Sequence, residues 1–535
     1  MNRAGGRRTG AAVSRPAGGA AVSRPIGGTG LPPCHAGIDV GTSAVKAVLV
    51  EPDGRVSARS RVPLPADAGG ERDSLDWLDG TRAALAQLPD QERARVCSVG
   101  LTGLTPGTVL VDEAGHPTGP ALTWQHSAAT AEAAELAARF GDTTELLGTS
   151  LPWGPGYPPA QLAWLARRRP QARAATRWVL QAKDFVGMAL TGSPASDRWS
   201  SKGICNVLTG APADAILRAA GWDPVVCPPA AEPWEPRGTV TAEAADRFGI
   251  PAGVPVSVGW SDALGGMLAL GVFERPRAFA ILGTSCIAGV SLAPGTGAVG
   301  SGLLNVPATV APLALAYGPT QNGGSALDWL AALTGRDVPE LMDLSERADL
   351  AATPVFAPYL AGERAPLWEA GARGVLTGLV TATGAAELAR ATLRGIAATV
   401  RNVIEHAEQA AGTHYPAVIV GGSMAGHPAW LTAAHEVLGR EFSVTDDEPS
   451  GYGAAMCGAS AAGFSLPHLA ARAPQPLAGA APADESFAQF IAATHVSLAA
   501  VRLATGRGPA DRPLCPPGGP PAAIWPGPTD GAAGI

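Results

Sequence analysis

Residues 35–50 read HAGIDVGTSAVKAVLV, and they indicate the fold class of the whole chain. Two runs rich in β-branched residues flank a short Gly-Thr-Ser turn, which predicts a β-hairpin. A second hairpin of the same design begins about 240 residues later, where residues 277–292 read RAFAILGTSCIAGVSL. Alternating strand and helix patterns follow each hairpin, so we predict an α/β protein with two similar lobes.

Hydrophobic periodicity places further elements around the two hairpins. Buried strands are predicted where short apolar runs end in glycine or turn residues, at 96–102, 108–112, 254–259 and 417–421. Helices are predicted where the apolar positions follow helical spacing, at 74–88, 128–140, 158–170, 172–190, 324–334, 384–411 and 427–438.

The composition is that of a globular protein with a large core. Hydrophobic residues make up 46% of the 535 residues and the net charge is -7, which together exclude disorder throughout. The acidic balance argues against a nucleic-acid polymer or an anionic membrane as partner, because both attract basic surfaces. A membrane-spanning helix needs about 20 consecutive apolar residues, and the sequence contains no uninterrupted run of that length. Arg7 and Arg8 lack the apolar segment that a secretory signal requires.

The cysteines bear on disulfides and metal sites, and the lysines are few enough to consider one by one. The seven cysteines are odd in number and irregularly spaced, which indicates neither a disulfide framework nor a zinc site. Reduced thiols and a cytoplasmic location are therefore expected. Only three lysines occur, Lys46, Lys183 and Lys202, so each of them is worth examining.

Breaker-rich segments mark both ends of the chain. Residues 11–28 hold a tandem repeat, AAVSRPAGG followed by AAVSRPIGG, and we predict a disordered tail over 1–33. The proline-rich residues 508–535 are predicted to be a second disordered tail. Between the tails, the restart of the pattern divides the chain into a first lobe, 34–272, and a second lobe, 273–507.

The two Gly-Thr-Ser turns are candidate phosphate sites, because turns rich in backbone N–H groups and hydroxyls bind phosphate oxygens. Asp39, beside the first turn, could hold a hydrated Mg²⁺. Two such turns facing each other across a cleft would clamp a polyphosphate, although each alone is equally well explained as an ordinary hairpin. The candidate residues are Gly41, Thr42 and Ser43 in the first turn and Gly283, Thr284 and Ser285 in the second.

Asp262 lies in a glycine-rich, otherwise apolar junction, VGWSDALGG. A carboxylate in such a place must be solvated, paired or functional, because burying it alone is costly. Near a phosphate site it could accept a proton from an attacking hydroxyl. The alternative is that Asp262 caps the following helix.

A second glycine-rich junction, VIVGGSMAG at residues 418–426, follows a predicted strand. Its Gly421, Gly422 and Ser423 could let a flat ring or a ribose approach the backbone closely. The alternative is simple packing of the strand against a helix.

In this order the motifs resemble the FGGY carbohydrate kinases, which include xylulokinase, gluconokinase and glycerol kinase and belong to the actin-like ATPase superfamily. The resemblance covers roughly residues 36–465, and PYLAGERAP at 358–366 is its most specific string. The other matching strings are DVGTSAVKAV, GLTG, WQ, the G-x-x-D-A around Asp262, LGTS and VGGS.

This resemblance implies two ribonuclease-H-like lobes around an interlobe catalytic cleft, with ATP and Mg²⁺ as cofactors. Asp262 would be the general base, and Asp39 would lie near Mg²⁺ and the transferring phosphate. The first lobe would bind the sugar and the second the nucleotide, with both Gly-Thr-Ser turns on phosphates and Gly421, Gly422 and Ser423 against the adenosine. Lys46 is assigned a structural role in its strand, and Glu363 and Arg364 are expected to form an ion pair near the cleft.

Several positions depart from the xylulokinase pattern at the acceptor end. Thr105 and Pro106 stand where xylulokinases have Met-His, and His126 stands at an acidic position of the string that begins at Trp124. Ala263 replaces an asparagine. We therefore expect an altered acceptor, although other members of the family could tolerate the same changes. The candidate acceptor-binding residues are Thr105, Pro106, Trp124, His126, Trp260 and Ala263.

The leading hypothesis is transfer of the ATP γ-phosphate to a sugar hydroxyl, with a pentulose such as xylulose as acceptor. A cyclitol, an aldonate or another polyol is the alternative acceptor. A catalytically weak metabolite sensor is an alternative of another class, and a filament-forming or chaperone-type ATPase is a third. The expected partner is a small sugar or polyol, and a homodimer stays open.

Overall fold

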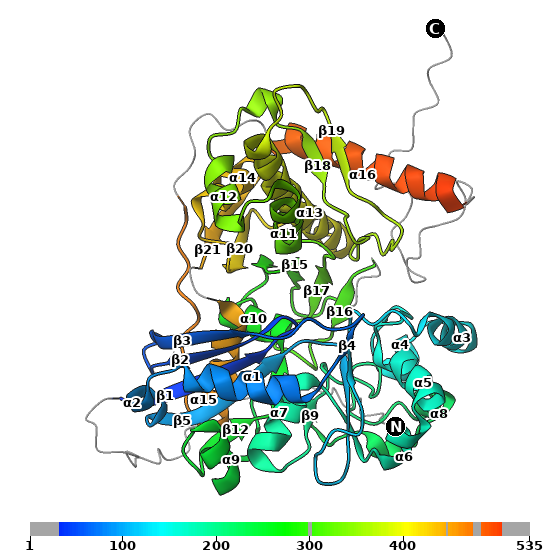
Figure 1. Ribbon diagram of the computed structural model, residues 1–535, viewed down its shortest axis with the longest axis vertical. Coiled ribbons are helices and arrows are strands. Elements are labelled where there is room, and N and C mark those ends of the chain that lie inside the picture. Colours follow the sequence, from blue (N-terminus) through cyan, green and yellow to red (C-terminus); the bar gives the residue numbers. More distant parts are fainter. Residues whose placement is uncertain (1–31, 298–301, 446–447, 475–482, 506–535) are drawn as a thin grey trace, which may run out of the picture.

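The computed structural model describes residues 32–297, 302–445, 448–474 and 483–505, which form two lobes, one above the other in Figure 1. The predicted first tail lies outside these residues except for Pro32 and Pro33, and the predicted second tail lies wholly outside them. Arg95 donates a hydrogen bond of 2.7 Å to the Pro32 carbonyl, so the described chain begins anchored to the first lobe.

The first lobe is built on a sheet whose strands run in the order β11-β12-β5-β1-β2-β3. The opening hairpin supplies β1 and β2, which pair antiparallel, and β3 continues the meander. β5 and β12 are parallel to β1. The strands span Cys34–Val40 (β1), Ala44–Val50 (β2), Val56–Pro63 (β3), Val96–Gly103 (β5), Pro236–Thr239 (β11) and Pro255–Ser257 (β12).

The second lobe repeats this design, with strands in the order β16-β17-β15-β14-β20-β21. Again a hairpin pairs antiparallel, here β14 with β15, and the next strands on the other side of β14 run parallel to it. The strands span Ala278–Leu282 (β14), Cys286–Ser291 (β15), Leu304–Val306 (β16), Leu315–Pro319 (β17), Ala417–Gly422 (β20) and Glu441–Val444 (β21). The predicted two-lobed α/β architecture is confirmed.

Helices cover both sheets, and short strands fill the connections. The helices are α1 Leu75–Ala86, α2 Asp90–Arg93, α3 Thr130–Phe140, α4 Thr144–Leu147, α5 Pro158–Arg168, α6 Pro170–Ala175, α7 Ala182–Thr191, α8 Asp214–Ala219, α9 Ala242–Phe248, α10 Asp262–Ala269, α11 Gly324–Thr334, α12 Val338–Ser345, α13 Ala385–Ala411, α14 Pro428–Val437, α15 Pro449–Ala461 and α16 Ala483–Thr505. The short strands are β4 Glu71–Arg72, β6 Gly107–Val111, β7 Ala121–Thr123, β8 Trp178–Leu180, β9 Ser196–Asp197, β10 Ala230–Ala231, β13 Trp260–Ser261, β18 Val355–Ala357 and β19 Val375–Thr377.

The helix predicted over 172–190 is wrong in its first half. The chain there forms the end of α6, then β8, and only then α7. β8 pairs antiparallel with β6, with Val109 opposite Leu180. The apolar run from Trp178 to Leu180 gains more from joining a buried strand than from continuing the helical periodicity, which is a tertiary effect that local spacing does not report.

α15 crosses the predicted boundary between the lobes. It follows β21 of the second sheet in the chain, yet it packs against β1, β5 and α10 of the first lobe. Glycines permit this contact: a Cβ on Gly100 in β5 would lie 1.6 Å from the carbonyl oxygen of Ala454. The predicted second lobe, 273–507, therefore contributes one helix to the packing of the first (Figure 1).

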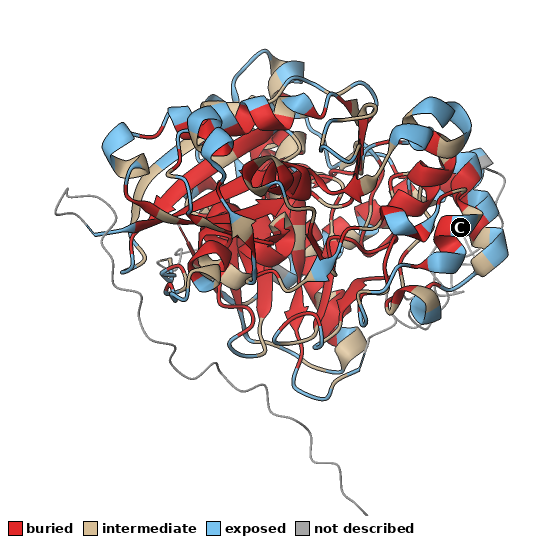
Figure 2. Ribbon diagram, turned by 90° about the horizontal axis from the view of Figure 1, so that it is seen from below, coloured by how far each residue is buried: buried red, intermediate tan, exposed pale blue. Residues whose placement is uncertain are grey.

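The buried residues fill the interior of both lobes, while the outer helices carry exposed faces (Figure 2). Among the described residues, α16 is long and apolar enough to cross a membrane, judged by length and composition alone. No membrane span was predicted from the sequence. It packs on the second lobe, where Phe490 is buried and Thr494 lies 3.0 Å from the Tyr359 hydroxyl.

Candidate active site

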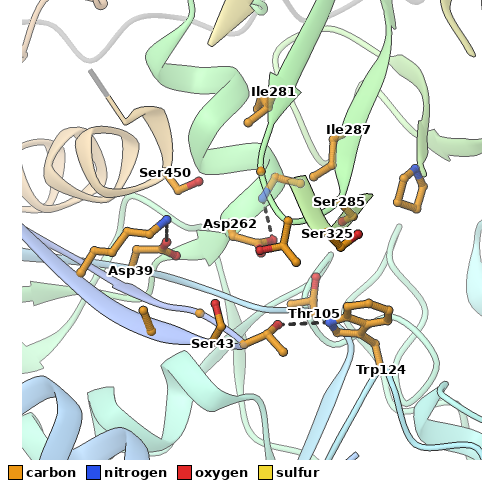
Figure 3. Close-up of a pocket in the computed structure, with 18 of the residues that line it drawn as sticks. Asp39, Ser43, Thr105, Trp124, Asp262, Ile281, Ser285, Ile287, Ser325 and Ser450 are labelled. Atoms are coloured by element: carbon orange, nitrogen blue, oxygen red, sulfur yellow. Dashed lines mark hydrogen bonds and ion pairs between the residues drawn. The ribbon is translucent and has the colours of Figure 1, made fainter. Parts of the chain in front are cut away.

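A cavity of about 1180 Å³ lies between the lobes and is lined by both of them. Its volume exceeds the roughly 300–1,000 Å³ typical of a site for one small molecule, so it has room for two ligands. Figure 3 shows Asp39, Asp262, Ser43 and Ser285 around this one cavity. The sequence candidates that line it are Asp39, Gly41, Thr42, Ser43, Thr105, Pro106, Trp124, Asp262, Ala263, Gly283, Thr284, Ser285 and Ser423.

Asp39 owes its surroundings to the central position of β1. The strand register places Lys46 of β2 on one side of it and Thr102 of β5 on the other. The Lys46 ammonium lies 3.3 Å from Oδ2, and the Thr102 hydroxyl donates to Oδ1 at 3.2 Å. Burial raises the pKa of Asp39, and the charge of Lys46 opposes that rise.

Asp262 is the first residue of α10, and the helix is capped by its neighbour Ser261, whose hydroxyl accepts from the backbone N–H of Leu264 at 3.3 Å. The alternative that Asp262 itself caps the helix is therefore wrong. Its Oδ1 accepts from the N–H of Ala263 at 2.7 Å. Burial, reinforced by the nearby charge of Asp39, raises the pKa of Asp262 to about 7. A carboxylate with such a pKa can take a proton and release it near neutral pH.

The first Gly-Thr-Ser turn, residues 41–43, is held from behind. Its three carbonyl oxygens accept hydrogen bonds from the Trp77 indole at 3.2 Å, the Arg72 guanidinium at 3.0 Å and the Leu64 N–H at 2.9 Å. Because these bonds tie the carbonyls into the lobe, the repulsive oxygens are kept away from any anion in the cavity. The arrangement suits a phosphate group.

The second Gly-Thr-Ser turn, residues 283–285, is anchored to the start of α11. The carbonyls of Gly283 and Thr284 accept from the backbone N–H groups of Gly324 and Ser325, at 2.9 and 3.1 Å. Ser325 also lines the cavity (Figure 3). The two turns thus reach one cavity from different lobes, as the sequence predicted.

Asp39 is a suitable ligand for Mg²⁺, although the described residues contain no cluster of three or more His, Cys, Asp or Glu side chains. Mg²⁺ usually takes one or two protein carboxylates and completes its shell with waters and substrate phosphates. One carboxylate beside two turns that are candidate phosphate sites fits that pattern.

Trp124 and Arg364 form one wall of the cavity. The Trp124 indole N–H donates to the Thr42 hydroxyl at 3.2 Å, and the Arg364 guanidinium lies 4.5 Å from the Trp124 ring centroid. The Arg364 guanidinium and the Glu363 carboxylate do not form the ion pair that was expected. Glu363 accepts instead from the backbone N–H groups of Gln321 and Arg364, at 2.5 and 2.8 Å. The Arg364 guanidinium donates to the Thr320 carbonyl at 2.5 and 3.2 Å, and the residue lines the cavity.

Two predicted acceptor-binding residues are not on the cavity wall. The His126 ring is buried against Trp164, with 4.9 Å between the ring centroids. Trp260 is completely buried and stacks on Phe273. We correct the prediction for both: His126 packs within the first lobe, and Trp260 packs in a core cluster that also includes residues of the second lobe.

Gly421 and Gly422 also lie behind the wall, and of that predicted trio only Ser423 reaches the cavity. The two glycines pair with Ile281 and Leu282 of β14. A Cβ on Gly422 would lie 2.0 Å from the carbonyl oxygen of Leu282. Close pairing with the neighbouring strand β14 therefore places these two glycines, whereas the alternative weighed from the sequence was packing of the strand against a helix.

Lys202 is a cavity residue that the motif analysis did not assign. Its ammonium lies 3.3 Å from the Thr105 hydroxyl, and the residue lines the cavity together with Tyr157 and Tyr317. The one signal in the sequence was the scarcity of lysine. It draws attention to Lys202 but does not predict that the residue lies at the cavity.

Comparison with known proteins agrees with this geometry. Residues 34–269 match the N-terminal domain of the FGGY family of carbohydrate kinases, and residues 278–462 match its C-terminal domain. The chain is 30% identical over 425 residues to a xylulose kinase of Escherichia coli, covering 76% of this chain and 85% of the relative. It is 30% identical over 430 residues to a xylulose kinase of Streptomyces coelicolor, covering 77% and 85%.

A crystal structure of xylulose kinase from Rhodospirillum rubrum superposes with a TM-score of 0.70 at 26% identity, covering 88% of this chain and all of the other. With both family domains matched in order, and with the two sheets and the interlobe cavity in place, the chain belongs to the FGGY family of carbohydrate kinases.

Proposed function

We propose that this carbohydrate kinase transfers the γ-phosphate of ATP to a hydroxyl of a sugar, using Asp262 as the general base. One observation carries the proposal: Asp262, with a pKa raised to about 7, faces a cavity that also receives both Gly-Thr-Ser turns. Phosphoryl transfer needs little covalent chemistry from the protein, so placing these groups together is most of the task.

In the proposed reaction Asp262 takes the proton of the acceptor hydroxyl as the hydroxyl oxygen attacks the γ-phosphorus. The bond between the γ-phosphorus and the oxygen that bridges it to the β-phosphate breaks, and ADP leaves with that oxygen. The two turns, 41–43 and 283–285, hold the phosphate oxygens by backbone N–H groups and hydroxyls. Asp39 lies beside them, held in place by Lys46 and Thr102. Mg²⁺, held by Asp39 directly or through water, would neutralise charge on the phosphates.

Xylulose is the first acceptor to test, because the two relatives compared above, each 30% identical to this chain, are named xylulose kinases. Thr105, Pro106, Trp124 and Ala263 line the cavity and would contact the sugar. The departures at Thr105, Pro106 and Ala263 keep an aldonate, a cyclitol or another polyol as the alternative. We expect the reaction to take place in the cytoplasm.

The decisive variant is Asp262→Asn, which keeps the side-chain shape and removes the base. We expect kcat for sugar phosphorylation to fall by roughly 100-fold or more, while ATP binding measured by calorimetry stays within about twofold. Asp246→Asn, at an exposed position of α9, is the matched control. Substantial turnover in Asp262→Asn would remove the residue as base. Binding of ATP without turnover of any acceptor by the unmodified enzyme would favour a metabolite sensor.

A further inference from the structure

The three lysines differ in how their charges are compensated. Lys183 is fully buried, and its ammonium lies 2.6 Å from Asp184 and 3.0 Å from Asp197. Lys46 lies 3.3 Å from Asp39 and 3.1 Å from Glu448. Each of these two lysines therefore has two carboxylate partners.

Lys202 has no carboxylate within ion-pair distance among the residues that the structure describes. It is 2% exposed, and its ammonium contacts the Thr105 hydroxyl at 3.3 Å and the Trp199 carbonyl at 3.4 Å. The Trp199 ring centroid lies 5.2 Å away. Asp197, the nearest acid along the chain, is already paired with Lys183. A buried ammonium held only by long bonds to neutral groups is costly unless a ligand supplies the missing negative charge.

The position of Lys202 indicates which ligand that is. Lys202 contacts Thr105, which follows β5 in the first lobe and lies on the cavity wall. Asp262 lines the same cavity, and its charge opposes the lowering of the Lys202 pKa by burial, so the two side chains are neighbours. Because the base must touch the acceptor, a cation in this neighbourhood faces the acceptor. Arg364 adds a second positive charge to the same cavity.

We propose that Lys202 binds a carboxylate of the acceptor, so that this kinase prefers a sugar acid, an aldonate or ketoaldonate of five or six carbons, to its uncharged counterpart. The inference rests on the proposed kinase function and specifies the acceptor class of the same site. The shared chemistry is recognition of an anionic oxygen, which a phosphate of ATP could also supply, so the test includes an arm for each source.

The state of Lys202 gives the preference a pH signature. Burial lowers the pKa of Lys202 to about 8, against the opposing charges of Asp197 and Asp262. The ammonium is therefore mostly charged at pH 7 and loses its proton as the pH rises through 8. Affinity for an acidic acceptor should decline over that range, and affinity for a neutral one should not decline for this reason.

The experiment compares acceptors that differ only in one carboxylate: D-gluconate against D-glucitol, and D-xylonate against xylitol, with D-xylulose as the neutral ketose. Turnover is followed by ADP release in the full-length enzyme and its Lys202→Met variant, which keeps the aliphatic stem. We expect Lys202→Met to lower kcat/KM for the preferred acid roughly 10- to 100-fold. Neutral acceptors should change by less than about threefold, and Lys202→Arg should restore part of the loss. Arg218→Met, at an exposed site of α8, is the control for loss of a positive charge.

Binding of D-gluconate and D-xylonate measured by calorimetry separates this inference from the proposed function. If both acids bind to the unmodified protein and not to Lys202→Met, the inference stands even when no acceptor is phosphorylated. Turnover of D-xylulose with no preference for either acid overturns the inference and leaves the kinase function standing. An increase in the KM for ATP in Lys202→Met, with acceptor selectivity unchanged, assigns Lys202 to the nucleotide phosphate and also overturns it.

Discussion

Asp39 and Asp262 face the same cavity, and their partners give the two carboxylates different properties. Asp39 receives an ammonium and a hydroxyl, whereas Asp262 accepts one backbone N–H group from Ala263. Burial raises the pKa of Asp39, and the ammonium of Lys46 opposes that rise, which favours the charged carboxylate that a residue beside a metal ion needs. That charge in turn disfavours ionisation of Asp262 and helps to hold its pKa near neutrality. These different partners suit two different proposed roles, with Asp39 beside the metal ion and Asp262 as the base.

This assignment predicts the pH dependence of the reaction with a neutral acceptor. Burial and the charge of Asp39 raise the pKa of Asp262 to about 7, so the free enzyme carries the protonated, inactive acid below that pH. We expect kcat/KM for D-xylulose to fall about tenfold for each pH unit below roughly 6.5, and to level off above about 7.5. A profile measured by ADP release that stays flat from pH 5 to 8 would contradict Asp262 as the base.

At the residue scale the sequence predicted the reacting groups better than the acceptor wall. Asp39, Asp262 and both turns lie in junctions bounded by glycines, and a short sequence motif is enough to single out such a junction. Lys202 and Arg364 reach the cavity through tertiary packing, and no local pattern reports that. His126 and Trp260 were misplaced for the same reason, because a polar or aromatic side chain can equally well turn into the lobe and pack.

At the scale of elements, the position of α15 explains several glycines at once. A helix can lie directly on the backbones of β1 and β5 only where no Cβ intervenes. Gly37 and Gly100 provide this in the strands, and Gly458 provides it in the helix. Glu448 is the N-cap residue of α15: its Oε2 accepts from the Gly451 N–H at 3.0 Å, and its Oε1 accepts from the Lys46 ammonium at 3.1 Å. Close packing of α15 therefore holds the residue that compensates Lys46, and Lys46 in turn holds Asp39.

Gly100→Ala tests that packing. The added Cβ would lie 1.6 Å from the Ala454 carbonyl oxygen, which is backbone and cannot swing away, so α15 must shift. We expect the free energy of unfolding to drop by about 3 kcal/mol or more. Gly297→Ala, where the Cβ would meet nothing within 4 Å, should be neutral. Melting curves followed by circular dichroism compare the two variants, and equal melting temperatures would show that α15 does not pack tightly on β5.

The elements themselves were predictable where one local signal dominated. The two hairpins follow from β-branched runs around a turn, and α13 from a long helical periodicity ending at Gly412. The structure of residues 172–190 was not predictable in this way, because β8 forms only by pairing with β6, which is distant in the sequence. The attachment of α15 to the first lobe depends on contacts between residues far apart in the chain, such as Thr102 and the Ser450 carbonyl, which are 348 residues apart and 3.2 Å from each other.

For the whole molecule, the main consequence of two lobes is that the reacting groups are divided between them. Asp39, Asp262 and the first turn belong to the first lobe, and the second turn belongs to the second. A cavity of about 1180 Å³ has room for both proposed ligands and also for water, which would compete with the sugar hydroxyl for the phosphoryl group. Ligands that contact both lobes would favour a smaller separation between them.

We therefore predict that the enzyme becomes more compact when both substrates are bound. Small-angle X-ray scattering with Mg²⁺, a non-hydrolysable ATP analogue and the best acceptor should give a smaller radius of gyration than the free enzyme. Either ligand alone should give a smaller decrease, since each has most of its contacts in one lobe. Asp262→Asn should contract as the unmodified enzyme does, because removal of the base leaves the binding contacts in place. An unchanged radius with both ligands bound would mean that the structure already has its reactive geometry, and that water must be excluded by the acceptor itself.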